Sequence, residues 1–186
     1  MIDAKEIIEE QVISLAKKIS LSAITAPKAR GVDNLEIRIA YGKELEQISE
    51  KLKELNQKTG QEFLLRDSNN VLQSQAVILI GSKVKVLGLD CGYCGFDSCR
   101  EKEEKAPLAP CFFNSNDLGI AIGSMCSQIA DSRIDSRVMF SVGLAAKELA
   151  FLPECSTVLA IVMSVSNKNV FFDRVVNKNE KIICYK

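Results

Sequence analysis

Residues 76–81 read Ala-Val-Ile-Leu-Ile-Gly, five apolar residues closed by a glycine. A short apolar run with this boundary predicts a strand that is buried on both faces. Residues 157–164 are mostly Val, Leu, Ile and Ala and predict a second central strand. We therefore expect the fold to be built around one sheet that contains both segments.

The flanking sequence supplies the other elements of this fold. Leu35, Ile37 and Ile39 alternate with charged residues, which predicts a strand over residues 35–40 with one buried face. Apolar residues at helical spacing predict helices. Helices are expected over residues 2–24, 45–60, 117–130 (capped by Asp117) and 141–151. The segment 61–75 is unclear or a short helix. Short strands are expected over residues 170–172 and 182–185. Because helices and strands mix without strict alternation, the fold class is α+β in one domain, residues 1–186.

Composition excludes several classes of function. The chain has 186 residues, 47% of them apolar, and 24 basic residues balance 24 acidic ones. This balance predicts a globular protein without the basic footprint of a nucleic-acid binder. No apolar run approaches the roughly 20 residues of a membrane span, and the charged N-terminus is unlike a secretory signal. We expect a cytoplasmic protein with neither membrane nor nucleic acid as a partner.

Histidine is absent, and seven cysteines are present. Without histidine the chain cannot form a Ser-His-Asp triad, a Cys-His dyad or a His-ligated zinc or haem site. In a cytosolic protein, this many cysteines indicate metal or redox chemistry and not a disulfide framework.

Four of the cysteines form one motif. Residues 91–99 read Cys-Gly-Tyr-Cys-Gly-Phe-Asp-Ser-Cys, and Pro110 precedes Cys111. Two residues between Cys91 and Cys94 let one tight turn direct both thiolates at one centre, and the glycines supply the necessary backbone freedom. A [4Fe–4S] cluster held by Cys91, Cys94, Cys99 and Cys111 fits this pattern of three close ligands and one remote. We expect the segment 88–115 to be an inserted cluster-binding loop.

Two other interpretations of these cysteines remain open. The same four thiolates could hold a structural zinc ion, although zinc ribbons commonly use two CxxC pairs. They could also be metal-free buried thiols. Cys126, Cys155 and Cys184 lie outside the motif and are interpreted as small buried hydrophobes.

Three further groups of charged residues are candidate functional sites. Asp131, Arg133, Asp135 and Arg137 would line one face of an extended segment, as an ion-pair network or a solvated connection. Residues 100–105 read Arg-Glu-Lys-Glu-Glu-Lys and predict a solvated helix face, with a docking surface for an electron-transfer partner as the alternative. Lys28 and Arg30 could hold a phosphate.

The segments CGYCGFDSC…PC and DLGIAIGS…ADSRIDSRVMFSVGLAA resemble an uncharacterised prokaryotic family of ferredoxin-domain-containing proteins. The cysteine spacing is also similar to the small [4Fe–4S] domains of corrinoid iron–sulfur proteins and electron-transport subunits, which implies the same four ligands. The order of elements resembles the nitroreductase fold, which implies a homodimer with FMN at the subunit seam. In that case Lys28, Arg30 and Arg174 are candidates for the flavin phosphate. The first helix carries Lys5, Glu6, Glu9 and Glu10 where that family has arginines.

We therefore expect a nitroreductase-like α+β domain that carries an iron–sulfur loop and acts in electron transfer or redox sensing with a redox partner protein. One alternative is a flavin-dependent oxidoreductase fed by the cluster. The other is a non-redox module with a four-cysteine zinc site.

Overall fold

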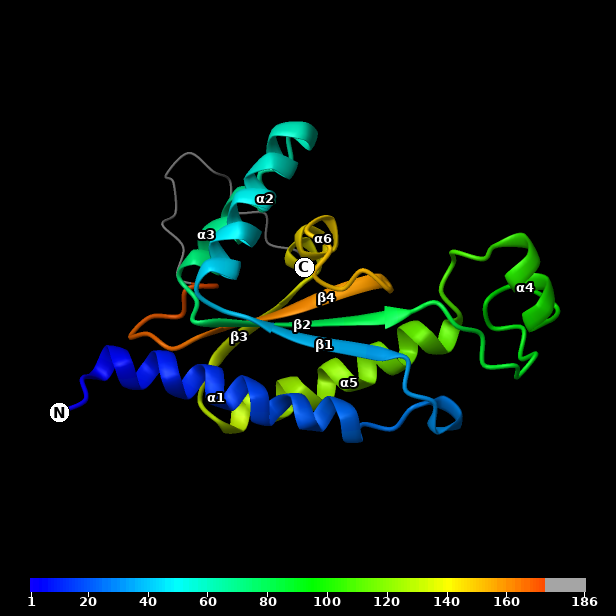
Figure 1. Ribbon diagram of the computed structural model, residues 1–186, viewed down its shortest axis with the longest axis horizontal. Helices are drawn as coiled ribbons and strands as arrows, with labels where there is room; N and C mark the ends of the chain where they lie inside the picture. Colours follow the sequence, from blue (N-terminus) through cyan, green and yellow to red (C-terminus); the bar gives the residue numbers. More distant parts are fainter. Residues whose placement is uncertain (173–186) are drawn as a thin grey trace, which may run out of the picture.

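A four-stranded antiparallel sheet lies at the centre of the protein, as shown by a computed structural model that describes residues 1–172. Its strands are β1 (Leu35–Ala40), β2 (Ala76–Lys83), β3 (Asp135–Met139) and β4 (Cys155–Ser164). They lie in the order β1-β2-β4-β3 (Figure 1), and each neighbouring pair is antiparallel. The two segments predicted as central strands are β2 and β4, so this prediction is confirmed.

Helices cover both faces of the sheet. On one face lie α1 (Ala4–Thr25) and α5 (Phe112–Asp131); on the other lie α2 (Lys43–Thr59), α3 (Phe63–Leu72) and α6 (Phe140–Glu148) (Figure 1). Ile78 and Ile80 pack with α1 and α5, whereas Val77 and Leu79 pack with the other layer. Because both faces of β2 are covered, the strand lacks the apolar–polar alternation seen in β1. No helix within residues 1–172 has both the length and the apolar character needed to cross a bilayer.

Several boundaries differ from the sequence-based expectations. The segment 61–75 contains a regular helix, α3, and α6 ends at Glu148. Residues 170–172 lie in a turn region and do not form the expected strand. The expected strand 182–185 lies outside the described residues.

The largest difference is the start of α5, which begins at Phe112 and not near residue 117. Asp117 does not cap this helix: it lies inside it, is buried, and accepts a hydrogen bond of 3.1 Å from the Ala29 amide. Cys111 is the N-cap instead. Asp117 was mistaken for a helix start because aspartate is a common N-cap residue. Its actual hydrogen-bond partner, the Ala29 amide, is distant in sequence and leaves no local signal.

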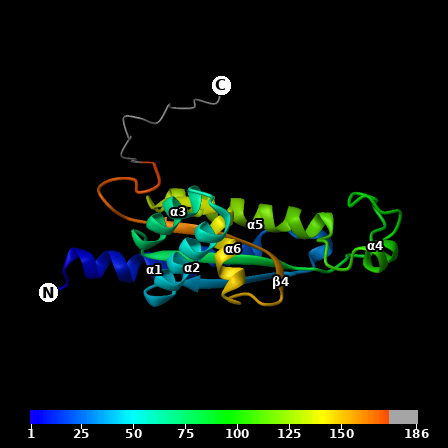
Figure 2. The ribbon, with the colours of Figure 1, turned by 90° about the horizontal axis from the view of Figure 1, so that it is seen from above.

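The connection between β2 and α5 projects from one end of the sheet. It spans residues 84–111 and contains the short helix α4 (Cys99–Lys105). Figures 1 and 2 show α4 and its flanking loops extending beyond the end of β2, away from the two helical layers. All four cysteines of the motif lie on this projecting segment or at the start of α5.

A substitution at Gly143 tests how closely α6 packs against β4. A Cβ at this position would lie 2.6 Å from the Val158 carbonyl carbon and 2.9 Å from Leu159 Cα, and neither backbone atom can rotate away. We expect Gly143→Ala to lower the free energy of unfolding by about 3 kcal/mol, at the upper end of overpacking costs. Urea denaturation measures the change.

Gly123→Ala is the matched control, because a Cβ on Gly123 in α5 would meet nothing within 4 Å. Alanine is favoured over glycine in a helix, so this variant is expected to gain up to about 1 kcal/mol. Equal effects of the two substitutions would contradict the close contact between α6 and β4.

Candidate metal centre

The four cysteines of the motif line a single pocket at the projecting end of the molecule. Cys91, Cys94, Cys99 and Cys111 share its wall with Leu89, Asp90, Phe96 and Phe113, among others. All four are free thiols; Cys111 is buried, whereas the other three are partly exposed. The structure thus brings together the residues that the spacing of the motif selected.

Tight turns direct the first three thiols toward this pocket. Gly92 and Gly95 have φ angles of 72° and 83°, values that side-chain-bearing residues rarely adopt. The Gly95 amide donates a hydrogen bond of 2.9 Å to the Gly92 carbonyl, which closes the turn that contains Cys94. The glycines therefore have the conformational function expected from the sequence.

Cys99 is fixed by the start of α4. Its amide donates to Asp90 Oδ1 at 2.6 Å, and Ser98 caps the helix by accepting from the Glu101 amide at 3.1 Å. Asp90 itself has a positive φ of 44°. One carboxylate thus ties the beginning of the loop to its third cysteine.

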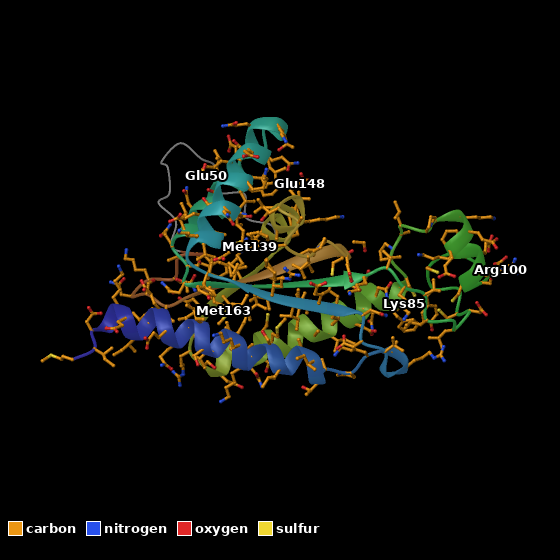
Figure 3. All side chains as sticks on the ribbon, in the orientation of Figure 1. Glu50, Lys85, Arg100, Met139, Glu148 and Met163 are labelled. Carbon is orange, nitrogen blue, oxygen red and sulfur yellow. The ribbon has the colours of Figure 1, made fainter. Side chains whose placement is uncertain are left out.

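Cys111 is fixed by Asn114, a residue that sequence reasoning did not select. Asn114 is 2% exposed; its Oδ1 accepts from the amides of Cys111 (3.1 Å) and Lys85 (3.2 Å), and its Nδ2 donates to the Lys85 carbonyl (3.1 Å). Lys85 lies where the chain leaves β2, and Arg100 lies on α4 beyond it (Figure 3). Asn114 therefore clamps the two ends of the projecting segment together. A polar residue three positions after a helix N-cap is the signal that could have identified it.

Two of the four cysteines lie at the start of a helix. Cys111 is the N-cap of α5, a helix of 20 residues, and Cys99 is the first residue of α4. Because the N-terminus of a helix is the positive end of its dipole, an anionic group bound in the pocket would lie in a favourable field.

A single metal ion and a cluster require different spacings of their donor atoms. Among residues 1–172, no three Cys, Asp or Glu side chains lie close enough together to hold one metal ion. Zinc needs all four sulfurs about 2.3 Å from a single point. A [4Fe–4S] cluster takes its four cysteines at four different irons and so accommodates more widely spaced sulfurs. Four thiols around one pocket are compatible with such a cluster.

The candidate phosphate ligands already have partners. The Lys28 ammonium donates to the carbonyls of Ala23 (2.7 Å), Ile24 (2.8 Å) and Ala26 (3.0 Å), and so closes the C-terminal end of α1. Arg30 donates through Nη1 to the Leu87 carbonyl, which connects the loop after α1 to the wall of the cysteine pocket. Arg174 lies outside the described residues.

The alternating charges near residue 134 do not share one extended segment. Asp131 ends α5, Arg133 turns the chain with a φ of 58°, and Asp135 and Arg137 lie in β3. Arg137 stacks 5.5 Å from the centre of the Phe172 ring. The expected single face therefore exists only for the last two residues.

Comparison with known proteins places this architecture in context. The sequence profile of a family described as "Uncharacterized protein containing a ferredoxin domain" (DUF2148) matches residues 108–174, a range that contains Cys111 but not the three earlier cysteines of the motif. An uncharacterized protein from Archaeoglobus fulgidus is 36% identical over 96% of this chain and 100% of its own length.

Solved structures of nitroreductases share the fold. A nitroreductase family protein from Clostridium novyi NT has a TM-score of 0.56 at 15% identity, covering 82% of this chain and 73% of its own. A nitroreductase with bound FMN from Desulfitobacterium hafniense has a TM-score of 0.54 at 13% identity, covering 83% and 78%. Nitroreductase A from Vibrio parahaemolyticus has a TM-score of 0.54 at 8% identity over 84% of this chain, which spans only 59% of that protein's length. The expected nitroreductase-like α+β fold is confirmed.

The described cysteines outside the motif have protonated thiols at neutral pH. Burial raises the pKa of Cys126, which lies in α5. Burial, followed by the nearby Glu36 carboxylate, raises the pKa of Cys155 to about 11. A raised pKa makes a thiol a poor nucleophile and metal ligand, which supports their interpretation as small buried hydrophobes. Cys184 lies outside the described residues.

The pKa of Cys155 predicts a pH dependence of stability. The pKa of the Cys155 thiol is about 11 in the folded protein, above the ordinary thiol value of 9.0. The folded state therefore binds the thiol proton more tightly than the unfolded state does, and this difference stabilises the fold. The stabilisation is complete below about pH 9 and is lost as the pH rises through about 11. We expect wild type to lose more free energy of unfolding than Cys155→Ala across this interval. Urea titrations of both proteins at each pH measure the difference, and parallel losses would contradict it.

Proposed function

The chain belongs to the family of uncharacterised proteins containing a ferredoxin domain, and we propose that it binds a [4Fe–4S] cluster through Cys91, Cys94, Cys99 and Cys111. The observation that carries this proposal is that all four thiols line one pocket. Segment 88–115 is then the cluster-binding insertion of a single domain. The free state of these thiols suits the reducing cytoplasm in which we place the protein.

The residues around the pocket perform the protein's part of the chemistry. A bound cluster supplies one-electron transfer, and its potential responds to local charge, hydrogen bonds and exposure. Cys111 would bind the cluster from the N-terminus of α5, and Asn114 and Asp90 fix the backbone at Cys111 and Cys99, respectively. No proton transfer by an imidazole is needed, which suits a chain without histidine.

The exposure of the pocket supports electron exchange with another protein. Cys91, Cys94 and Cys99 are partly exposed, and beside them Tyr93 is 68% exposed and packs its ring 5.3 Å from that of Phe112. A group at this end of the molecule would lie near the surface, within reach of a redox partner. We therefore propose electron transfer or redox sensing as the function.

The cysteines provide the direct test. Protein reconstituted anaerobically with iron and sulfide is expected to be brown, with a broad absorbance band at about 400 nm that dithionite bleaches. Cys99→Ala and Cys111→Ala are expected to lose the cluster, because each removes one iron ligand. Metal and acid-labile sulfide analysis measures occupancy.

Cys155→Ala is the matched control, since this thiol is buried outside the pocket, and it is expected to retain full occupancy. Full occupancy in Cys111→Ala would show that the fourth ligand is wrongly assigned. A colourless protein with one zinc ion per chain would establish the structural zinc site instead.

A flavin-dependent oxidoreductase is the second candidate function, and the fold favours it. One structural neighbour is described as a nitroreductase with bound FMN. A flavin site in this chain would use Lys28, Arg30 or Arg174 for its phosphate and, by the same resemblance, a homodimer. Since Lys28 and Arg30 already bind backbone carbonyls, a phosphate would have to displace those contacts or rely on Arg174.

We expect FMN to remain unbound under conditions in which the cluster assembles. Gel filtration after incubation with FMN, followed by flavin absorbance of the denatured protein fraction, measures binding; the same elution volume reports the oligomeric state. One FMN per chain would overturn this expectation and make the oxidoreductase the leading function.

A further inference from the structure

Lys102 is a buried cation without a hydrogen-bond partner. Its residue is 1% exposed, and within residues 1–172 nothing forms a hydrogen bond with its Nζ. It is also one of the two buried side-chain nitrogen or oxygen atoms in this part of the chain that lack such a partner. A buried charge without a partner destabilises a folded protein, because it has lost water and gained nothing in return.

The other cations of α4, in contrast to Lys102, are exposed and form ion pairs. Arg100 pairs with Glu104 at 2.8 Å, and Lys105 pairs with Glu101 at 2.7 Å; the side chains of the two cations are 88% and 67% exposed. Both carboxylates are thus used by exposed residues. The buried cation has no carboxylate within ion-pair distance in the described residues.

Lys102 lies one helical turn from Cys99, a residue of the cysteine pocket, although it does not itself line that pocket. It lies three residues after Cys99, and residues at this spacing occupy the same helix face. Cys99 lines the pocket from the first turn of α4. The buried Lys102 and the third cysteine therefore lie on the same side of α4, one turn apart.

The proposed cluster is the anion that this ammonium lacks. Four thiolates carry more negative charge than the iron–sulfide core that they bind carries positive charge, and one-electron reduction adds further negative charge. We propose that Lys102 is the internal counter-ion of the four-thiolate centre, stabilising the bound group and most strongly its reduced form. This inference rests on the proposed function.

Lys102→Met tests the inference, because methionine is similar in length and carries no charge. In metal-free protein the substitution removes an uncompensated buried charge, so the urea midpoint of unfolding is expected to rise. In reconstituted protein it removes the counter-ion, so the midpoint potential in an anaerobic dithionite titration is expected to shift downward. Loss of iron to a chelator is expected to be about tenfold faster, as for other residues that support metal ligands.

Lys105→Met is the matched control, since it removes the same charge from an exposed position on the same helix. Solvent and salt screen this charge, so its potential and chelation rate are expected to stay near those of wild type. Lys102→Arg keeps a cation and is expected to restore much of the potential.

Each outcome has a distinct meaning. An unchanged potential in Lys102→Met, or equal shifts in Lys102→Met and Lys105→Met, would overturn the role of Lys102 while leaving the proposed cluster intact. A lower urea midpoint of the metal-free variant would show that the ammonium is already compensated by the protein, which also overturns the inference. Failure of wild type to take up iron and sulfide would instead reject the proposed function.

Discussion

The antiparallel pairing of β2 with β4 is the constraint on which the rest of the structure depends. Both strands are apolar on both faces, so they fold only where helices cover the two sides at once. Ile78 pairs with Ile161 in one layer, and Leu79 pairs with Ala160 in the other. The chain must therefore place α1 and α5 on one face and α2, α3 and α6 on the other. The segment from β2 to α5 then connects the end of the sheet to one of these layers.

That connection explains why the cysteines gather at one end of the molecule. The segment leaves the sheet after β2 and has little apolar core of its own, so local devices hold it. Asn114 clamps Lys85 to Cys111, Asp90 binds the Cys99 amide, and Arg30 binds the Leu87 carbonyl. These contacts link the loop to the fixed start of α5. The sheet therefore provides the anchor, and polar contacts to the backbone provide the shape.

Sequence patterns predicted what depends on neighbours along the chain and missed what depends on distant partners. The apolar runs identified β2 and β4, and the cysteine spacing identified four residues that share one pocket. Asp117 resembled a helix cap because its partner, the Ala29 amide, lies 88 residues away. Lys102 lies in a run of six charged residues that predicts a solvated face, yet it is buried. Tertiary packing alone decides which residue of such a run is buried. The pattern of charged residues along the sequence does not identify that residue.

The absence of histidine gives this buried lysine its significance. A metal group held by neutral imidazoles adds no negative charge to its protein, whereas one held only by thiolates is anionic and requires compensation. The exposed cations of α4 are screened by solvent and paired with Glu101 and Glu104, so they compensate little. What remains is the helix N-terminus at Cys111 and Lys102, one helical turn after Cys99. The proposed ligand set made only of cysteine would thus account for the otherwise unfavourable burial of a cation one helical turn away.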